Sequence, residues 1–117
     1  TWDDELRRRL REPRPGPEAQ LRFAPQPLLG RWHPADQPAD ARRAAALLLL
    51  YPGDTGPALV LTVRHPDLPH HGGQVSLPGG GLDVGESPEA GALREAHEEI
   101  GLPPGAAEVL GQLSSLW

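Results

Sequence analysis

Three glutamates and one arginine lie within the short stretch REAHEEIGL, residues 94–102. Residues three and four apart lie on the same side of a helix, so a helix here would gather Glu95, Glu98 and Glu99, with Arg94 one turn before Glu98. Neighbouring carboxylates repel each other, and hard divalent cations such as Mg²⁺ relieve that repulsion because they prefer oxygen ligands. Taken alone, the stretch fits either a hard-metal site or a solvated acidic face, which is the commoner use of a charge run on a helix.

The residues that flank these glutamates predict the helix that must position them, over residues 88–100. Ser87 is a favourable N-cap, and Pro88 suits the first helical position, where a missing N–H costs nothing. Gly101 suits the C-terminal stop. One arc of this helix is apolar and can pack on a sheet; it consists of Ala92, Leu93, Ala96 and Ile100.

The wider spacing of charged residues and glycines resembles the Nudix box. Gly80, Glu86 and the run Arg94-Glu95-x-x-Glu98-Glu99-x-Gly101-Leu102 match its specified positions, whereas Ala96 replaces a larger aliphatic residue. The resemblance implies an α/β fold, the α/β/α Nudix sandwich with a mixed sheet and the box as a loop-helix-loop. It also implies hydrolysis of a nucleoside diphosphate linked to another moiety.

The same resemblance implies a metal site and a set of catalytic residues. Mg²⁺ or Mn²⁺ would be held by Glu95, Glu98 and Glu99, with the Gly79 carbonyl as a further ligand. Arg94 joins these glutamates in the catalytic group, and we expect it to form an ion pair with Glu86 that braces the loop and the helix.

A second resemblance lies just upstream, in LTVRHPDLPHHGGQVSLPGG, residues 61–80. This segment is similar to the signature of the coenzyme A diphosphatase subfamily of Nudix enzymes, with Leu68 and Leu77 as its two departures. The resemblance implies cleavage of coenzyme A or its derivatives to 3′,5′-ADP and 4′-phosphopantetheine. The candidate substrate-binding residues are Arg64, His71, Gly79 and Gly80.

Simpler roles remain open for these upstream residues, and other functions remain open for the chain. Arg64 can offer a bidentate fork to a phosphate or form a surface salt bridge. His71 can hydrogen-bond a loop or a substrate phosphate. The rival functions are hydrolysis of ADP-ribose, a dinucleotide or a nucleoside triphosphate, and nucleotide binding by a non-catalytic Nudix module.

Composition narrows the partners and the compartment. The 117 residues carry a net charge of −5, which argues against general binding to nucleic acid or an anionic membrane. The chain has no cysteine, which fits a reducing compartment, and no apolar run long enough to span a bilayer. We therefore expect a cytoplasmic protein, and the two resemblances imply a small nucleotide substrate. The sequence sets no oligomeric state.

The chain divides into an N-terminal helix and proline-rich arm, residues 1–40, and a Nudix domain, residues 41–117. We expect a helix over residues 1–12, with Arg7, Arg8 and Arg9 on a solvated face, and an extended arm over residues 13–38 pinned by Phe23 and Trp32. Strands are expected over residues 44–51, 58–64, 74–77 and 107–116. So few residues follow the box that we expect the C-terminal part of the fold to be missing.

Overall fold

The computed structural model describes residues 1–24 and 33–117. They form two compact units, each considered by itself below. The arm unit consists of residues 1–42 and 110–117, and the box unit consists of residues 43–109.

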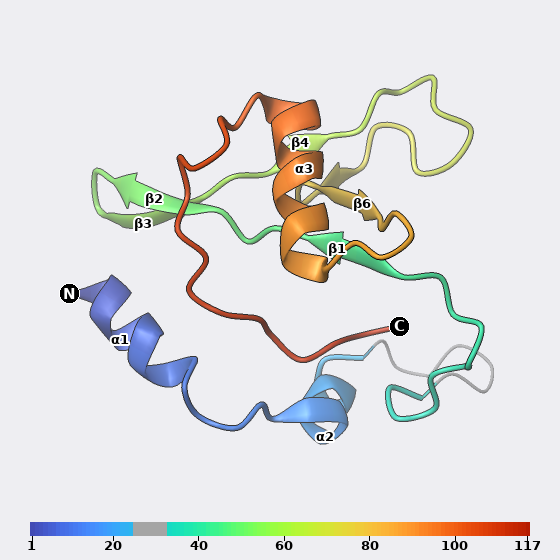
Figure 1. The fold of residues 1–117 in the computed structure, drawn as a ribbon, viewed down its shortest axis with the longest axis horizontal. Coiled ribbons are helices and arrows are strands. Elements are labelled where there is room, and N and C mark those ends of the chain that lie inside the picture. The colour runs from blue at the N-terminus through green and yellow to red at the C-terminus, as the bar shows by residue number, and fades with distance from the viewer. Residues whose placement is uncertain (25–32) are drawn as a thin grey trace. The chain divides into compact units, whose positions relative to one another are not determined.

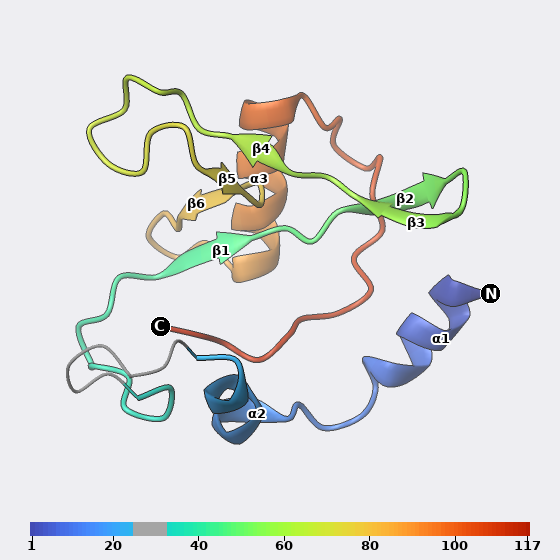
Figure 2. The same ribbon diagram turned by 180° about the vertical axis from the view of Figure 1, so that it is seen from behind.

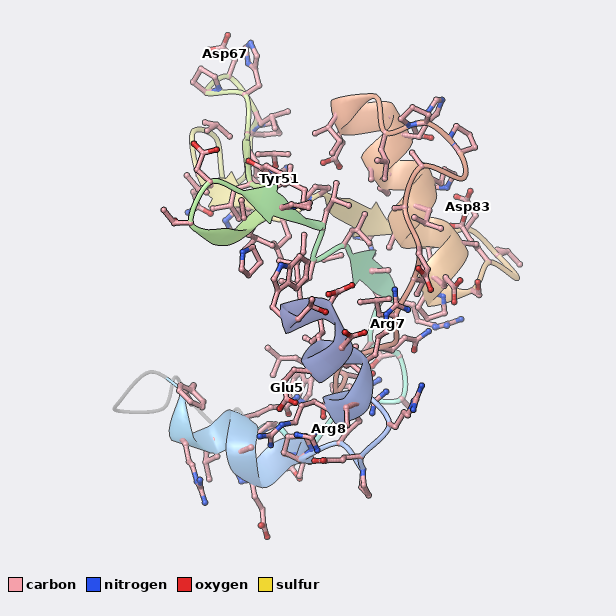
Figure 3. The ribbon with its side chains drawn as sticks, turned by 90° about the vertical axis from the view of Figure 1, so that its left-hand side faces the viewer. Glu5, Arg7, Arg8, Tyr51, Asp67 and Asp83 are labelled. Atoms are coloured by element: carbon pink, nitrogen blue, oxygen red, sulfur yellow. The ribbon has the colours of Figure 1, made fainter. Side chains whose placement is uncertain are left out.

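The arm unit contains two short helices, α1 (Trp2–Arg9) and α2 (Gly16–Arg22). α1 confirms the expected N-terminal helix, and two of its arginines are exposed: Arg8 donates to Glu5 and Glu12, and Arg9 donates to Glu5. Arg7 differs from the expectation, because it is half-buried. Figure 3 labels Glu5 and Arg8 on this helix. These exposed pairs add little stability, as is usual for ion pairs in water.

Two expectations for the arm are wrong. Residues 13–38 are not wholly irregular, because α2 forms within them; its proline lies in the first turn, where no N–H partner is lost. Phe23 does not pin the arm, since it is 89% exposed. Trp32 lies outside the described residues.

The strands of the box unit form three antiparallel pairs among the described residues. β1 (Ala44–Ala46) pairs with β6 (Gly79–Gly81). β2 (Leu50–Gly53) and β3 (Gly56–Leu59) form the expected hairpin. β4 (Thr62–Val63) pairs with β5 (Val75–Ser76), which confirms the short strand expected over residues 74–77.

Helix α3 (Pro88–Ile100) has the bounds that the sequence predicts, and it packs on β6 and β1 (Figure 1). Ser87 Oγ accepts the Ala90 N–H at 3.1 Å, and Gly101 ends the helix in the left-handed conformation, with φ of 71°. The apolar arc is only partly covered: Ala92 and Ala96 are buried, whereas Ile100 is exposed. This helix therefore docks on the strands through small side chains, which allow a close approach.

Three expected strands differ from the structure. Residues 58–64 do not form one strand, because β3 ends at Leu59 and β4 begins at Thr62. Residues 44–51 do not form one buried strand, because β1 ends at Ala46 and β2 begins at Leu50, and the apolar side chains between and within them are not fully covered. Residues 107–116 form no strand, and from residue 110 onward they belong to the arm unit. Figure 2 shows this last segment running without an arrow.

Large apolar side chains are exposed at alternating positions from the end of β3 through the link to β4, namely Leu59, Leu61 and Val63, and at Val75 on the strand paired with β4. The intervening residues Val60 and Thr62 are less exposed. Because side chains alternate between the faces of a strand, one face of these strands is open among the described residues. We call Leu59, Leu61, Val63 and Val75 the open strand face. None of the helices in the described residues is long and apolar enough to cross a membrane.

Candidate functional site

Arg94 is the centre of the predicted site, because its guanidinium contacts both the loop before α3 and two glutamates on the helix. It donates two hydrogen bonds to Glu86, from Nε to Oε2 at 2.8 Å and from NH2 to Oε1 at 2.9 Å. The same guanidinium donates to the Gly81 carbonyl at 3.1 Å. Through NH1 it contacts Glu95 at 3.1 Å and Glu98 at 3.3 Å. The structure therefore contains the expected Arg94–Glu86 brace.

The brace keeps Glu86 ionised. The Arg94 hydrogen bonds, helped by the Asp83 N–H, lower the pKa of Glu86 to about 2. In return, the hydrogen bonds with Glu86 and then with Glu95 and Glu98 raise the pKa of Arg94. Asp83 adds its own carboxylate 3.5 Å from Arg94 Nε, and Figure 3 labels it in the loop that leads into α3. A charge-assisted bidentate pair of this kind fixes the orientation of the Arg94 guanidinium as well as its distance from the Glu86 carboxylate.

Glu95 lies directly against the backbone of β6. A Cβ on Gly80 would come within 2.6 Å of Glu95 Oε1, so the carboxylate could keep this place only beside glycine and would have to shift for a larger residue. Gly79 is as tightly enclosed, because a side chain there would collide with Ala45 and Ala46 of β1. The two glycines thus bring the main chain close to the carboxylates of α3.

Glu99 lies one turn after Glu95 and meets it. Partial burial of its carboxyl raises the pKa of Glu99, and so does the nearby Glu95 carboxylate. The neighbouring Gly79 N–H and the positive charge of Arg64 oppose that rise. Two like-charged groups are thus held together beside the β6 backbone.

Glu98 differs from the other two glutamates. Its side chain is 55% exposed and faces Arg94, whereas that of Glu95 is 17% exposed. Among the described residues, no three acidic or histidine side chains are gathered closely enough to hold a metal ion. The Glu95–Glu99 pair nevertheless fits a hard divalent cation in its chemistry, since it offers adjacent oxygen ligands whose repulsion a cation relieves. Glu98 could add a third carboxylate only by turning from Arg94.

Two of the predicted substrate-binding residues, Arg64 and His71, belong to a closed loop between β4 and β5. Arg64 follows β4, and its backbone bonds Gln74 and Gly73, which closes the loop between β4 and β5. His71 lies inside this loop, exposed and with φ of 57°, an uncommon conformation for a residue other than glycine. Figure 3 labels Asp67 in the same loop, at its outer end.

Sequence reasoning missed two members of the Arg94 network, the Gly81 carbonyl and the Asp83 carboxylate. The only sequence signal for Asp83 is that it is acidic and lies three positions before Glu86. Nothing in the residue type marks a backbone carbonyl as a partner, so Gly81 could not have been identified from its sequence position.

Comparison with known protein families identifies the class of protein that this site belongs to. The NUDIX domain profile matches residues 40–116. The chain therefore belongs to the Nudix family, which also confirms the α/β Nudix fold class that the sequence predicts.

Similar individual proteins are Nudix hydrolases by name. The uncharacterized Nudix hydrolase NudL of Citrobacter koseri is 47% identical over 73 residues, which are 62% of this chain and 38% of the relative. NudL of Escherichia coli K12 is 47% identical over 72 residues, 61% of this chain and 38% of the relative. The chain thus spans about 38% of the length of these curated relatives.

Among solved structures, the Nudix hydrolase RenU of M. smegmatis is 46% identical, with a TM-score of 0.48. The match covers 53% of this chain and 40% of RenU.

Proposed function

We propose that this chain is the box-bearing part of a divalent-metal-dependent hydrolase that cleaves the diphosphate of coenzyme A or a derivative, giving 3′,5′-ADP and 4′-phosphopantetheine. The observation that carries the proposal is the Glu95–Glu99 pair, which is held against the backbone of Gly79 and Gly80. Two adjacent carboxylates beside close-lying main chain suit a metal–diphosphate ligand better than they suit a solvated face.

The residues that would hold Mg²⁺ or Mn²⁺ are Glu95, Glu98 and Glu99, with the Gly79 carbonyl as a further ligand. A divalent cation bound there would supply neutralisation of the diphosphate and a lowered pKa for the attacking water. Arg94 acts as the positioning residue, since its bonds to Glu86 and the Gly81 carbonyl fix the guanidinium that contacts Glu95 and Glu98.

The choice of coenzyme A rests on the similarity of residues 61–80 to the coenzyme A diphosphatase signature. Arg64 supports it physically, because its side chain lies near Glu99 and carries no hydrogen bond or ion pair in the described residues. Coenzyme A carries a 3′-phosphate in addition to its diphosphate, so an available guanidinium can make a contact that ADP-ribose lacks. Gly80 and His71 complete the proposed substrate contacts, with the His71 imidazole donating a hydrogen bond to a phosphate.

The test compares turnover of coenzyme A and ADP-ribose in the presence of Mg²⁺ or Mn²⁺. We expect a higher kcat/KM for coenzyme A than for ADP-ribose. We expect Arg64→Ala to reduce this preference, expressed as a difference in activation free energy, by about 1–3 kcal/mol, the scale of a charged hydrogen bond. Arg42→Ala is the matched control, because it removes an exposed arginine from the arm unit and should leave the preference unchanged. Faster turnover of ADP-ribose by the wild type would reject the coenzyme A assignment and keep the Nudix family.

The rival functions give different results in the same assay. Turnover of ADP-ribose, a dinucleotide or a nucleoside triphosphate above that of coenzyme A would assign another substrate. A non-catalytic nucleotide-binding module would turn over none of them. Titration calorimetry with Mn²⁺ separates a module without metal from an enzyme that lacks its substrate, since only the latter binds the cation.

A further inference from the structure

The C-terminal segment of the arm unit is extended and belongs to no helix or strand, yet it is held at three successive points. The Arg14 Nε–H donates to the carbonyl of Gln112. The Gly16 N–H donates to Ser114 Oγ at 3.2 Å. The Gln20 side-chain amide donates to the carbonyl of Ser115 at 2.7 Å. Donors spaced along residues 14–20 thus meet acceptors spaced along residues 112–115.

The donor at Arg14 is itself fixed. Its NH1 group bonds the carbonyl of Leu10 at 2.7 Å and that of Glu12 at 2.8 Å, just after α1. One guanidinium therefore fastens the end of α1 and the Gln112 carbonyl together. An arginine with several acceptors loses little further freedom when it takes one more.

The side-chain amide of Gln20 is half-buried, and its two ends differ. In the described part of the chain, Gln20 Oε1 is buried and has no hydrogen-bond partner. The Nε2 group makes its bond to Ser115 at an exposed position. Gln20 is therefore held at this place by one bond, from its donor end.

We propose that Arg14, Gly16 and Gln20 form a clasp that recognises an extended main chain and holds residues 112–115, the segment that follows the box unit in the sequence. Two of its three acceptors are backbone carbonyls, so the clasp binds the extended backbone rather than the side chains of Gln112 and Ser115. Its third acceptor is the side-chain hydroxyl of Ser114. The proline-rich arm thereby acts as a strap on the chain leaving the box unit, a role that does not depend on the proposed reaction.

The test measures the backbone order of residues 110–117 by ¹⁵N relaxation of the whole 117-residue chain. In the wild type we expect order parameters close to those of the helices, near 0.85. Arg14→Ala and Gln20→Glu should lower them below about 0.6, because each removes a donor, and glutamate keeps the shape of glutamine. Residues 43–109 should be unchanged in both variants.

Two kinds of control make the result decisive. Arg22→Ala removes an exposed arginine of α2 that is not one of the clasp donors, and it should leave the order of residues 110–117 intact. Gln112→Ala and Ser115→Ala should also leave it intact, whereas Ser114→Ala should lower it in part. Low order in the wild type, no change in Arg14→Ala and Gln20→Glu, or an equal loss in Arg22→Ala would overturn the clasp.

Discussion

Arg94 shows how one side chain can order a group of carboxylates that would otherwise repel each other. It faces Glu86, Glu95 and Glu98, and it is 28% exposed, so its charge is only partly screened by water. Glu99 lies outside this group and meets Glu95 instead. The four glutamates therefore have two different environments, one neutralised by arginine and one in which two carboxyls share a site.

This difference predicts the behaviour of Glu99→Gln. The raised pKa of Glu99 means that its ionised form is disfavoured in the fold, so removing the charge should leave thermal stability in metal-free buffer at pH 7 equal or higher. If Glu99 holds the metal of the proposed hydrolase, turnover should fall by about 100-fold or more, since loss of even an outer partner of a metal site costs about 10- to 100-fold. Thermal unfolding and kcat measured on the same preparation check both parts. A marked loss of metal-free stability would show that Glu99 has a structural role instead.

The Glu86–Arg94 pair predicts a dependence of stability on pH. Because the folded-state pKa of Glu86 is about 2, against 4.5 in the absence of its partners, the ion pair stabilises the fold fully above about pH 4.5 and ceases to do so as the pH falls through 2. Glu86→Gln should therefore unfold at a lower temperature than the wild type at pH 7, and the difference should shrink toward pH 2. Thermal unfolding at pH 7, 4 and 2 measures this.

Glu89→Gln is the control for that series, since Glu89 is an exposed carboxylate in the first turn of the same helix. Its effect should be smaller at pH 7. A difference between Glu86→Gln and wild type that is constant across the three pH values would contradict the ion pair as the source of stability.

At the scale of elements, α3 owes its precise bounds to its two caps. Ser87→Ala removes the oxygen that accepts the Ala90 N–H and should lower the free energy of unfolding by about 1 kcal/mol. Ser87→Asp keeps an acceptor at the same place and should retain most of the stability. Denaturant unfolding of the two variants beside the wild type measures the difference. Equal losses in both would mean that the hydroxyl is not acting as a cap.

The elements that the sequence predicts correctly are those whose signals are local. Ser87, Pro88 and Gly101 lie at the ends of α3 itself, and the turn around Asp54 lies between the two strands of its hairpin. The interruption between β1 and β2 is different, since β1 pairs with β6, more than thirty residues later. Strand limits set by such distant pairing are absent from the strand's own residues.

Two other differences have separate origins. The prolines of residues 13–38 favour an irregular arm, but the proline of α2 lies in the first turn, where it is compatible with a helix. Residues 107–116 have the composition of a strand, but from residue 112 onward their described bonds go to the arm. The spacing of the glutamates and Arg94 matches the turns of a helix, so the sequence predicts them as one group. The Gly81 carbonyl that also bonds Arg94 has no such spacing and is not predicted.

For the whole molecule, the main feature is the open strand face. Contiguous exposed apolar side chains bind hydrophobic dyes, whereas single exposed ones are common on protein surfaces. We expect the chain to enhance the fluorescence of an anilinonaphthalene dye, and Val63→Thr with Val75→Thr to reduce the enhancement at least about twofold. Val84→Thr is the control, because Val84 is fully exposed in a loop outside this face. Equal reduction by Val84→Thr would contradict a contiguous dye-binding surface.

The left-handed backbone of His71 should make selection for stability and selection for activity favour different residues at this position. A left-handed conformation costs a residue other than glycine on the order of 1 kcal/mol or more, and glycine or asparagine would adopt it with less strain. A library of variants sorted only for heat resistance should therefore drift from histidine to glycine or asparagine at this position. The same library sorted for turnover should keep histidine if the imidazole contacts a phosphate, so the composition recovered at one codon would record whether catalysis or folding retains it.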